Sequence, residues 1–167
     1  MLQLILAIAG ILVFAALASS VLFVVGMRAK SPIVQVPIIW LGRHQFNKIA
    51  LRTAGTPETG TSIVRHRGRT SGRTFETPVG VLATDDGFLI ALPYGLRSNW
   101  LRNVLANGGA TLVHHGETVD VAGPEIVPMA SVETAFAQRE QRMHRIFNVT
   151  DVLHLRRAQP IAVAAAA

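Results

Sequence analysis

The stretch that decides the fold is Val64-Arg65-His66-Arg67-Gly68-Arg69-Thr70-Ser71-Gly72-Arg73, which runs on to Thr77-Pro78-Val79. It holds four arginines, two hydroxyl side chains and two glycines, and no carboxylate stands between Glu58 and Glu76. Arginine presents a planar fork of donors that suits phosphate or carboxylate oxygens, and glycine lets backbone N–H groups converge on an anion. The stretch predicts either an anion-binding turn or a basic hairpin turn that only faces water.

A second polar stretch, Ala91 to Gly109, contains Tyr94, Gly95, Ser98, Asn99, Trp100 and Asn103. Taken together, the two stretches resemble the deazaflavin-dependent nitroreductase family, small split β-barrel proteins that bind coenzyme F420. The family pattern is a strand, a Gly-Arg-x-Ser/Thr-Gly turn, a strand entered through a proline, a hairpin, and a short helix that carries a Trp and an Asn. These features occur here in that order, and the resemblance covers about Gly60 to Pro128.

The resemblance implies a site for an elongated anionic redox cofactor with a ring, a phosphodiester and a glutamate tail. The arginine turn suits the phosphate and the tail carboxylates, and the residues after it would lie along the ring. The second stretch would close the other side. The expected cofactor-binding residues are Arg67, Arg69, Thr70, Ser71, Gly72, Arg73, Thr77, Pro78, Val79, Tyr94, Gly95, Ser98, Asn99, Trp100 and Asn103. Trp100 packs equally well in a barrel core, whereas an amide such as Asn103 on a buried helix face needs a polar partner.

The implied chemistry is hydride transfer between the deazaflavin and an electron-poor acceptor, with the protein orienting the cofactor. Two residues are candidates for a catalytic proton donor: Tyr94, the only tyrosine, and His144. Members of the family that this chain resembles place a tyrosine in the C-terminal part, near the substrate. This chain has Met143, His144 and Phe147 there. FMN is the alternative cofactor because it shares a phosphate and a tricyclic ring; the arginines favour the more anionic F420 tail.

The N-terminal run from Met1 to Met27 is almost entirely apolar, and all sixteen basic residues follow it. Its length is sufficient to span a bilayer core of roughly 30 Å, and a signal peptide would have a basic start and a shorter apolar segment. We therefore expect residues 1–28 to be a single-pass membrane anchor in contact with lipids. The positive-inside rule puts the C-terminal domain in the cytoplasm. Such an anchor brings the site to an apolar electron acceptor such as a quinone, lipid or nitro compound.

The rest of the chain divides into a linker region, a barrel and a tail. Residues 29–59 should hold breaks at Pro32 and Pro37 and then an amphipathic helix, Pro37 to Thr53, that either lies on anionic headgroups or caps the barrel. Residues 60–158 should form an α+β fold, a small antiparallel split β-barrel with packed helices. Residues 159–167 read as a loose tail. Trp40 could lie at the membrane or in the core.

Turn and strand patterns place the barrel elements. The expected strands are Thr61–His66, Thr74–Thr84, Phe88–Leu92, Ala110–His115, Glu117–Val121 and Pro124–Val127. The expected helices are Asn99–Ala106, with Ser98 as its N-cap, and Ser131–Phe147, with Ser131 as its cap.

Several classes of function are excluded or disfavoured. The chain has no cysteine, no Gly-Lys-Ser/Thr phosphate loop, no Gly-x-Ser-x-Gly and no His-Glu-x-x-His. His114 and His115 are adjacent on an expected strand, so they should face opposite sides and share no metal; no metal site is expected. Only Phe75 lies near the arginines, which argues against a nucleic-acid partner. A non-catalytic, membrane-tethered protein that holds a cofactor or anionic lipid stays open, as does the oligomeric state.

Overall fold

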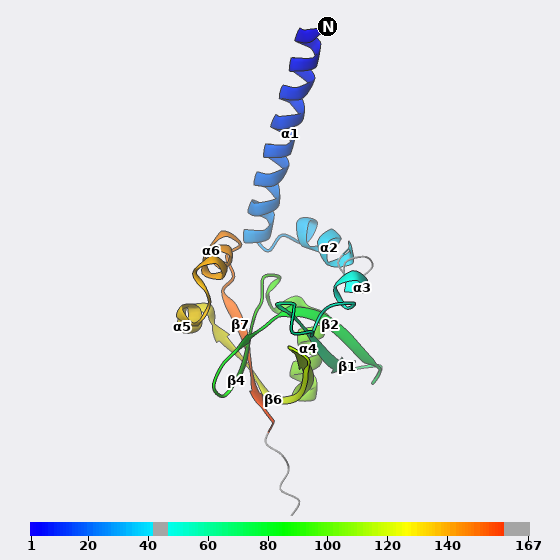
Figure 1. Ribbon diagram of the computed structural model, residues 1–167, viewed down its shortest axis with the longest axis vertical. Coiled ribbons are helices and arrows are strands. Elements are labelled where there is room, and N and C mark those ends of the chain that lie inside the picture. Colours follow the sequence, from blue (N-terminus) through cyan, green and yellow to red (C-terminus); the bar gives the residue numbers. More distant parts are fainter. Residues whose placement is uncertain (42–46, 159–167) are drawn as a thin grey trace, which may run out of the picture.

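The computed structural model describes residues 1–41 and 47–158, apart from the side chain of Lys48. A long helix, α1 (Leu2–Arg28), rises away from a curled sheet (Figure 1). It is followed by two short helices, α2 (Pro32–Leu41) and α3 (Asn47–Ala50). The expected tail, residues 159–167, lies outside the described residues.

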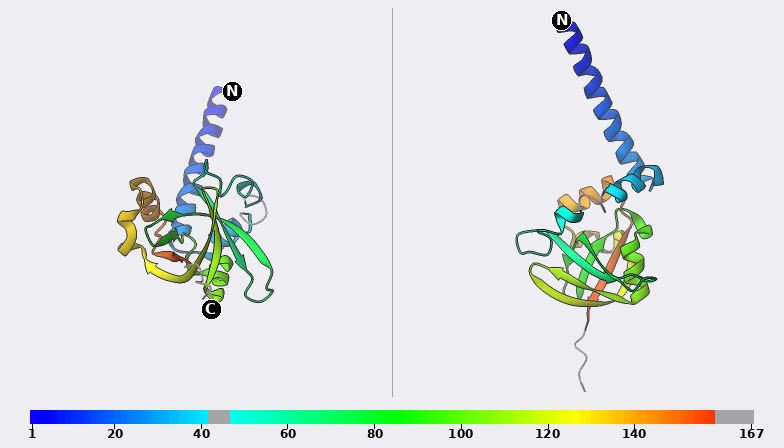
Figure 2. Two further views of the ribbon diagram at one scale, coloured as in Figure 1. Left: turned by 60° about the horizontal axis from the view of Figure 1, so that its bottom comes forward. Right: turned by 90° about the vertical axis from the view of Figure 1, so that its right-hand side faces the viewer.

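Within the described residues one antiparallel sheet has seven strands in the order β2-β1-β5-β6-β7-β4-β3. β1 and β2 form a hairpin, and β2 is an edge of the sheet. The sheet curls on itself, as Figure 2 shows, so that β2 comes near β4. The strand bounds are β1 (Thr61–Arg67), β2 (Thr74–Gly80), β3 (Leu82–Ala83), β4 (Gly87–Ala91), β5 (Gly109–His114), β6 (Glu117–Pro128) and β7 (Asp151–Arg157).

Helix α4 (Asn99–Asn107) packs against β1, β5 and β6, next to the 3-10 turn Gly95–Arg97. Its buried side chains, Leu101 and Val104, join the main core with Phe88, Ile90, Leu112, Leu153 and Leu155. Helix α4 ends at Gly108, whose φ of 70° is the left-handed conformation that glycine adopts without strain. A smaller core lies under α5 (Met129–Val132) and α6 (Gln138–Ile146) and includes Met129, Phe136 and Val152.

The expected α+β split barrel is confirmed, with one strand missed and two strand predictions changed. The missed strand is β7, which lies between β6 and β4 in the middle of the sheet. The expected strands Glu117–Val121 and Pro124–Val127 are one strand, β6, with an irregularity between Ala122 and Glu125. The expected strand Thr74–Thr84 divides at Val81, where the chain leaves the β1 edge and β3 pairs with β4 instead.

Two helix predictions were wrong. The helix expected over Pro37–Thr53 has other bounds: α2 begins at Pro32, where a proline at the first helical position is tolerated, and continues through Pro37. Residues 42–46 of the expected helix lie outside the described residues, and residues 51–53 form a turn. The expected helix Ser131–Phe147 divides because Phe136 is extended, with φ −79° and ψ 148°, and is buried in the smaller core. Helix α6 restarts after it, where the backbone N–H of Ala137 donates to Glu140 at 3.1 Å.

The end of α1 is fastened to the barrel side of the molecule. Arg28 donates from Nη1 to the carbonyl oxygens of Arg145 (2.7 Å) and Ile146 (2.9 Å), the last carbonyls of α6, where a cation is favoured by the helix dipole. Lys30 donates from Nζ to the Pro93 carbonyl at 3.0 Å. Met27 is buried, so the last turn of α1 is packed against the domain while the rest projects from it.

Candidate functional site

The arginine turn joins β1 to β2 and is closed by its own backbone. The Gly68 N–H donates to the Arg73 carbonyl, and the Gly72 N–H donates to the Gly68 carbonyl, both at 2.8 Å. Gly72 has a φ of 63°, and a Cβ on Gly68 would lie 2.8 Å from the Phe75 ring. The backbone at position 72 therefore favours glycine, and a larger residue at position 68 would have to displace the Ser71 and Phe75 side chains.

Helix α4 holds this turn through two asparagines. The buried Asn103 accepts at Oδ1 from the Arg69 guanidinium (2.9 Å) and from the Arg69 backbone N–H (3.3 Å). Asn99 Oδ1 accepts from the second Arg69 terminal nitrogen at 3.4 Å. The expected polar partner of Asn103 is thus confirmed, and Arg69, Asn99 and Asn103 lie together.

His66 extends this network into β2. Asn103 Nδ2 lies 3.1 Å from His66 Nδ1, and His66 Nε2 lies 3.2 Å from Thr77 Oγ1. Because the amide nitrogen can only donate, His66 Nδ1 accepts and its proton is on Nε2, which donates to Thr77. Burial lowers the pKa of His66, so the ring is neutral at neutral pH. His66 was not among the site residues expected from the sequence. Its position between Arg65 and Arg67 was the one feature of the sequence that could have indicated it.

Three arginines of the turn carry uncompensated charge. The fourth, Arg65, pairs with Glu76, the first carboxylate after the turn, at 2.8 Å. Arg67, Arg69 and Arg73 have no ion pair with any carboxylate in residues 1–41 and 47–158. Both bonds to the Arg69 guanidinium come from neutral amides, so its charge and its other donors stay available. The turn can therefore bind an anion with little rearrangement.

The other expected residues of the turn and of α4 occupy varied positions. Thr70 is exposed, and Ser71 Oγ accepts from the Arg73 N–H at 3.4 Å. Ser98 stands at the N-cap of α4, but its side chain makes no capping hydrogen bond. Gly95 has a φ of 66° in the preceding turn. Trp100 is partly buried against the main core.

Strand β2 leads from the turn to a pocket. Its seven residues span about 20 Å, with Thr77, Pro78 and Val79 partly buried in its second half. Gly80, Val81 and Leu82, at and beyond its far end, line a cavity of about 380 Å³. Cavities of this size accept small molecules.

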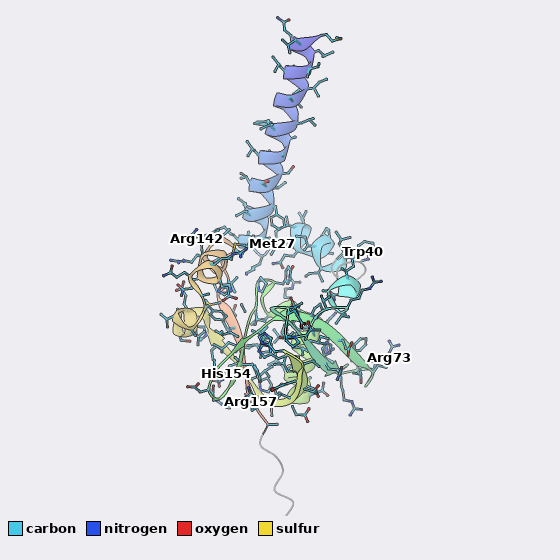
Figure 3. All side chains as sticks on the ribbon, viewed as in Figure 1. Met27, Trp40, Arg73, Arg142, His154 and Arg157 are labelled. Atoms are coloured by element: carbon cyan, nitrogen blue, oxygen red, sulfur yellow. The ribbon has the colours of Figure 1, made fainter. Side chains whose placement is uncertain are left out.

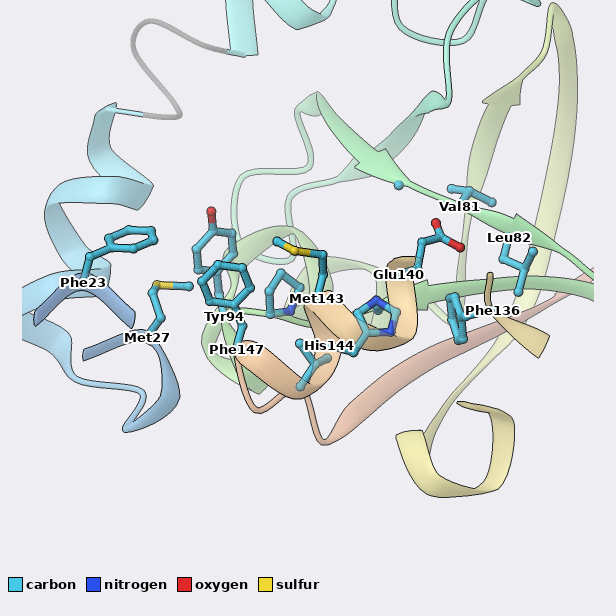
Figure 4. A pocket seen from close by; sticks show the side chains of 14 residues that line it. Phe23, Met27, Val81, Leu82, Tyr94, Phe136, Glu140, Met143, His144 and Phe147 are labelled. Carbon is cyan, nitrogen blue, oxygen red and sulfur yellow. The ribbon is translucent and has the colours of Figure 1, made fainter. Parts of the chain in front are cut away.

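The pocket is mainly apolar and is built from distant segments, as Figure 4 shows. Phe23 and Met27 reach it from α1, and Phe136, Met143 and Phe147 reach it from the α6 region. The rings of Phe23 and Phe147 meet edge to face, with centroids 6.1 Å apart. Of these five residues, the sequence indicated only Met143 and Phe147, as the residues present where the family places a tyrosine. It did not place Phe23, Met27 or Phe136 in the site, because their convergence depends on the packing of α1 against α6.

Both expected catalytic candidates, Tyr94 and His144, line this pocket. Burial raises the pKa of Tyr94, so its hydroxyl stays protonated and able to donate. Burial lowers the pKa of His144, against the weaker opposing effect of Glu140 and Glu133. His144 Nδ1 is buried and makes no hydrogen bond to the described residues. Figure 4 shows the Tyr94 hydroxyl directed away from His144, so the two are separate polar contacts.

The structure thus separates the expected residues into two groups. The arginine turn, Asn99 and Asn103 lie together at one end of β2, and Tyr94 and His144 each line the pocket beyond the other end. Asn107, a second residue that sequence reasoning left out, donates from Nδ2 to the Arg67 carbonyl at 2.9 Å and so also fastens the turn to α4.

The reasoning applied to His114 and His115 was wrong in geometry. His115 has a φ of 49° in the turn after β5, and its ring stacks on that of His114 with centroids 4.1 Å apart. The two rings therefore lie on the same side. Among the described residues no group of three or more His, Cys, Asp or Glu side chains could hold a metal ion.

Comparisons with known proteins reach only the fold. The chain matches no family model and no curated protein. It is similar to HutZ, a heme storage protein from Vibrio cholerae, at 12% identity over 68% of this chain and 92% of that chain, with a TM-score of 0.45. It is also similar to an F420 reductase (10% identity, 65% and 92% covered, TM-score 0.44) and to the F420-H2-dependent reductase FDR-A (13%, 57% and 93%, 0.41). Likeness this remote supports no argument about function, and the fold assignment rests on the strands themselves.

Proposed function

We propose that this protein is a membrane-anchored oxidoreductase that transfers a hydride between coenzyme F420 and an apolar electron acceptor such as a quinone, lipid or nitro compound. One observation carries the proposal: the edge strand β2 has an anion-binding turn at one end and an apolar pocket with two polar side chains beyond the other. An elongated cofactor with an anionic tail and a planar ring requires such an arrangement.

The donor set of the turn fits an anionic group. Arg67, Arg69 and Arg73 are without carboxylate partners in the described part of the chain, and Asn99 and Asn103 hold Arg69 in place. These residues, with Thr70, Ser71 and the Gly72 backbone, would hold the phosphate and tail carboxylates. Thr77, Pro78 and Val79 would lie beside the ring, and Gly95, Ser98 and Trp100 would close the site. F420, when bound, supplies the hydride.

On the acceptor side, the chain binds the apolar body and excludes water. Phe136, Met143 and Phe147 supply the apolar wall. Tyr94 and the neutral His144 would donate hydrogen bonds to an oxygen of the acceptor. Burial lowers the pKa of His144, so the protonated imidazolium is scarce at neutral pH. In the pocket His144 would therefore act as a hydrogen-bond donor and not as a general acid.

Helix α1 would place this pocket at a membrane. It is long and apolar enough to cross a bilayer, and none of its most apolar window is buried in the structure; a signal sequence passes the same test. Arg28, in its last turn, is its one basic residue, and the other fifteen follow it in the sequence, which favours a cytoplasmic domain.

The test is cofactor binding by the full chain in detergent or nanodiscs. Truncation after Arg28 would remove Phe23 and Met27 from the pocket, so the intact chain is needed. We expect F420 to quench tryptophan fluorescence, and Arg69→Ala to weaken binding by at least about tenfold, since a charge-assisted hydrogen bond contributes roughly 1.5–3 kcal/mol. Arg142→Ala, which removes an exposed arginine on α6 far from the turn in Figure 3, is the matched control.

The same titration with FMN separates the two cofactors. Tighter binding of FMN would keep the oxidoreductase proposal and change the cofactor. Binding of neither by a folded protein would overturn the proposal and leave a tethered, non-catalytic protein. If Arg69→Ala and Arg142→Ala had equal effects, the turn would not be the binding site.

A further inference from the structure

Helix α2 is apolar almost all round, so it exposes apolar side chains where a helix that covers a barrel exposes polar ones. Apart from Pro32 at its first position, its exposed residues follow the spacing of one helix face: Ile33, Val36, Pro37, Trp40 and Leu41. Ile33 is 85% exposed, Val36 61% and Leu41 41%, whereas the polar Gln35 is 5% exposed. No charged residue occurs in α2. A surface helix that meets water would carry polar side chains on its exposed face, so Ile33, Val36 and Leu41 need an apolar environment.

We propose that the outward face of α2, defined by Ile33, Val36, Pro37, Trp40 and Leu41, is embedded in the interfacial region of the same bilayer that α1 crosses. The inference rests on the membrane part of the proposed function and is independent of the cofactor. It concerns α2 as the structure has it, which begins at Pro32 and carries no charge, and not the basic amphipathic helix expected over Pro37–Thr53.

The connection between α1 and α2 places α2 at this depth. Only Ala29, Lys30 and Ser31 separate the two helices, and the Ser31 N–H donates to the Gly26 carbonyl at 2.9 Å. Gly26 packs so closely on Val34 that a Cβ there would overlap it. Helix α2 therefore starts where α1 leaves the bilayer, and an interfacial helix sinks its apolar face about 5–10 Å into the headgroup and acyl boundary.

Charges at the same level fit a lipid surface better than a second protein copy. Figure 3 shows Arg142 of α6, Met27 of α1 and Trp40 of α2 at one level, at the end of the domain from which α1 rises. Helix α6 also carries Arg139, and Arg145, which pairs with Glu133 at 3.6 Å; the end of α6 meets the end of α1 through Arg28. Basic side chains beside an apolar face suit anionic headgroups above acyl chains.

The orientation has a consequence for the pocket. Phe23 and Met27 form part of its wall, and they belong to the last turns of the helix that we propose crosses the bilayer. With α2 embedded, this wall lies at the boundary of the lipid phase. An apolar acceptor would therefore enter directly from the bilayer, without passing through water.

Spin labels on single cysteines test this directly, because the chain has no native cysteine. Ile33→Cys and Val36→Cys report on α2, and Leu12→Cys reports on α1. Asp85→Cys is the control for water; its neighbour Asp86 accepts a hydrogen bond from the Arg157 N–H, at the end of the barrel away from α1 in Figure 3. The full chain is reconstituted in vesicles of phosphatidylcholine and phosphatidylglycerol, and each label is exposed to oxygen and to a water-soluble nickel complex.

We expect the labels at positions 33 and 36 to collide more with oxygen than with nickel, as a lipid-embedded label does, and the label at 85 to do the reverse. Water-like behaviour at 33 and 36 with a lipid-like label at 12 would overturn the inference and keep the anchor. A water-like label at 12 would overturn the anchor itself. Protection from both reagents at 33 and 36, with spin–spin broadening, would mean that a second copy covers α2, which also overturns the inference.

Discussion

The two ends of β2 differ in how the chain holds its functional side chains. At the arginine turn, hydrogen bonds among Arg69, Asn103, His66 and Thr77 fix the geometry, and the contacts come from neighbouring elements of one barrel. At the pocket, apolar packing between α1 and the α6 region makes the shape. Hydrogen bonds therefore position the charged side chains, whereas the packing of segments far apart in the sequence shapes the apolar pocket.

The largest expected effect is at the pocket. Phe136→Ala should lower the free energy of unfolding by about 3 kcal/mol, because Phe136 is buried in the smaller core and its loss enlarges a cavity. Phe75→Ala, at the turn, is the matched control, and 40% of Phe75 is already exposed. Urea unfolding in detergent measures both. Equal losses would contradict the view that packing matters chiefly at the pocket end.

A smaller loss is expected at the turn. Asn103→Ala should cost about 2 kcal/mol, because it removes a buried amide and leaves the His66 and Arg69 groups without that partner. Asn99→Ala removes one long hydrogen bond at an exposed position and should cost much less. The difference between the two variants in the same unfolding assay measures the buried network, and a difference near zero would show that the network adds no stability.

The junction of α1 with α6 should contribute less again. Arg28→Ala removes two hydrogen bonds to the last carbonyls of α6 and should cost about 1 kcal/mol. Faster amide hydrogen exchange in the last turn of α6 is the expected local sign. Arg142→Ala should leave that exchange unchanged, and a matching increase in this control would assign the effect to net charge.

The smallest effect is a pH dependence that should differ between the two ends. Because burial lowers the pKa of His66 below its usual 6.5, the unfolded chain binds a proton before the folded chain does. The stability from neutral His66 is complete above pH 6.5 and is lost as the pH falls from 6.5 toward the folded pKa. His66→Gln should therefore flatten the slope of unfolding free energy against pH in this window.

His144 obeys the same sign, since burial also lowers its pKa, but Glu140 and Glu133 oppose the shift. We expect His144→Gln to change the slope less than His66→Gln. Unfolding measured at a series of pH values for the two variants decides between them. A larger change for His144→Gln would mean that folding lowers the pKa of His144, at the pocket, more than it lowers the pKa of His66.

Local patterns predicted the parts of the molecule that local chemistry determines. The glycines at positions 68 and 72 close the turn by backbone bonds, and the helix expected over Asn99–Ala106 is α4, which ends one residue later, before Gly108. A buried amide implied a polar partner, and Asn103 has one. In each case the signal and its cause lie within a few residues or in one hydrogen-bonding rule.

The missed features depend on long-range packing. Residues 151–157 lack the alternation of apolar and polar side chains that marks a half-buried strand. Val152 and Leu153 are both buried, because β7 lies in the middle of the sheet and is covered on both faces. The helix expected over Ser131–Phe147 has good local spacing, yet burial of Phe136 breaks it. The pocket required knowledge of where α1 docks, and no pattern in residues 1–28 indicates that Phe23 and Met27 would line it.

The position of β7 also sets an order of events during synthesis. Among the described strands, the hairpin of β3 and β4 is hydrogen-bonded to the rest of the sheet through β7, which is synthesised after the other six. Helix α1 is synthesised before all of them. An anchor inserted during translation would therefore be in the membrane before the barrel can close, and the two halves of the sheet would meet beside the bilayer surface. A chain that stops before Asp151 would leave two strand edges unpaired at that surface, where aggregation is a hazard.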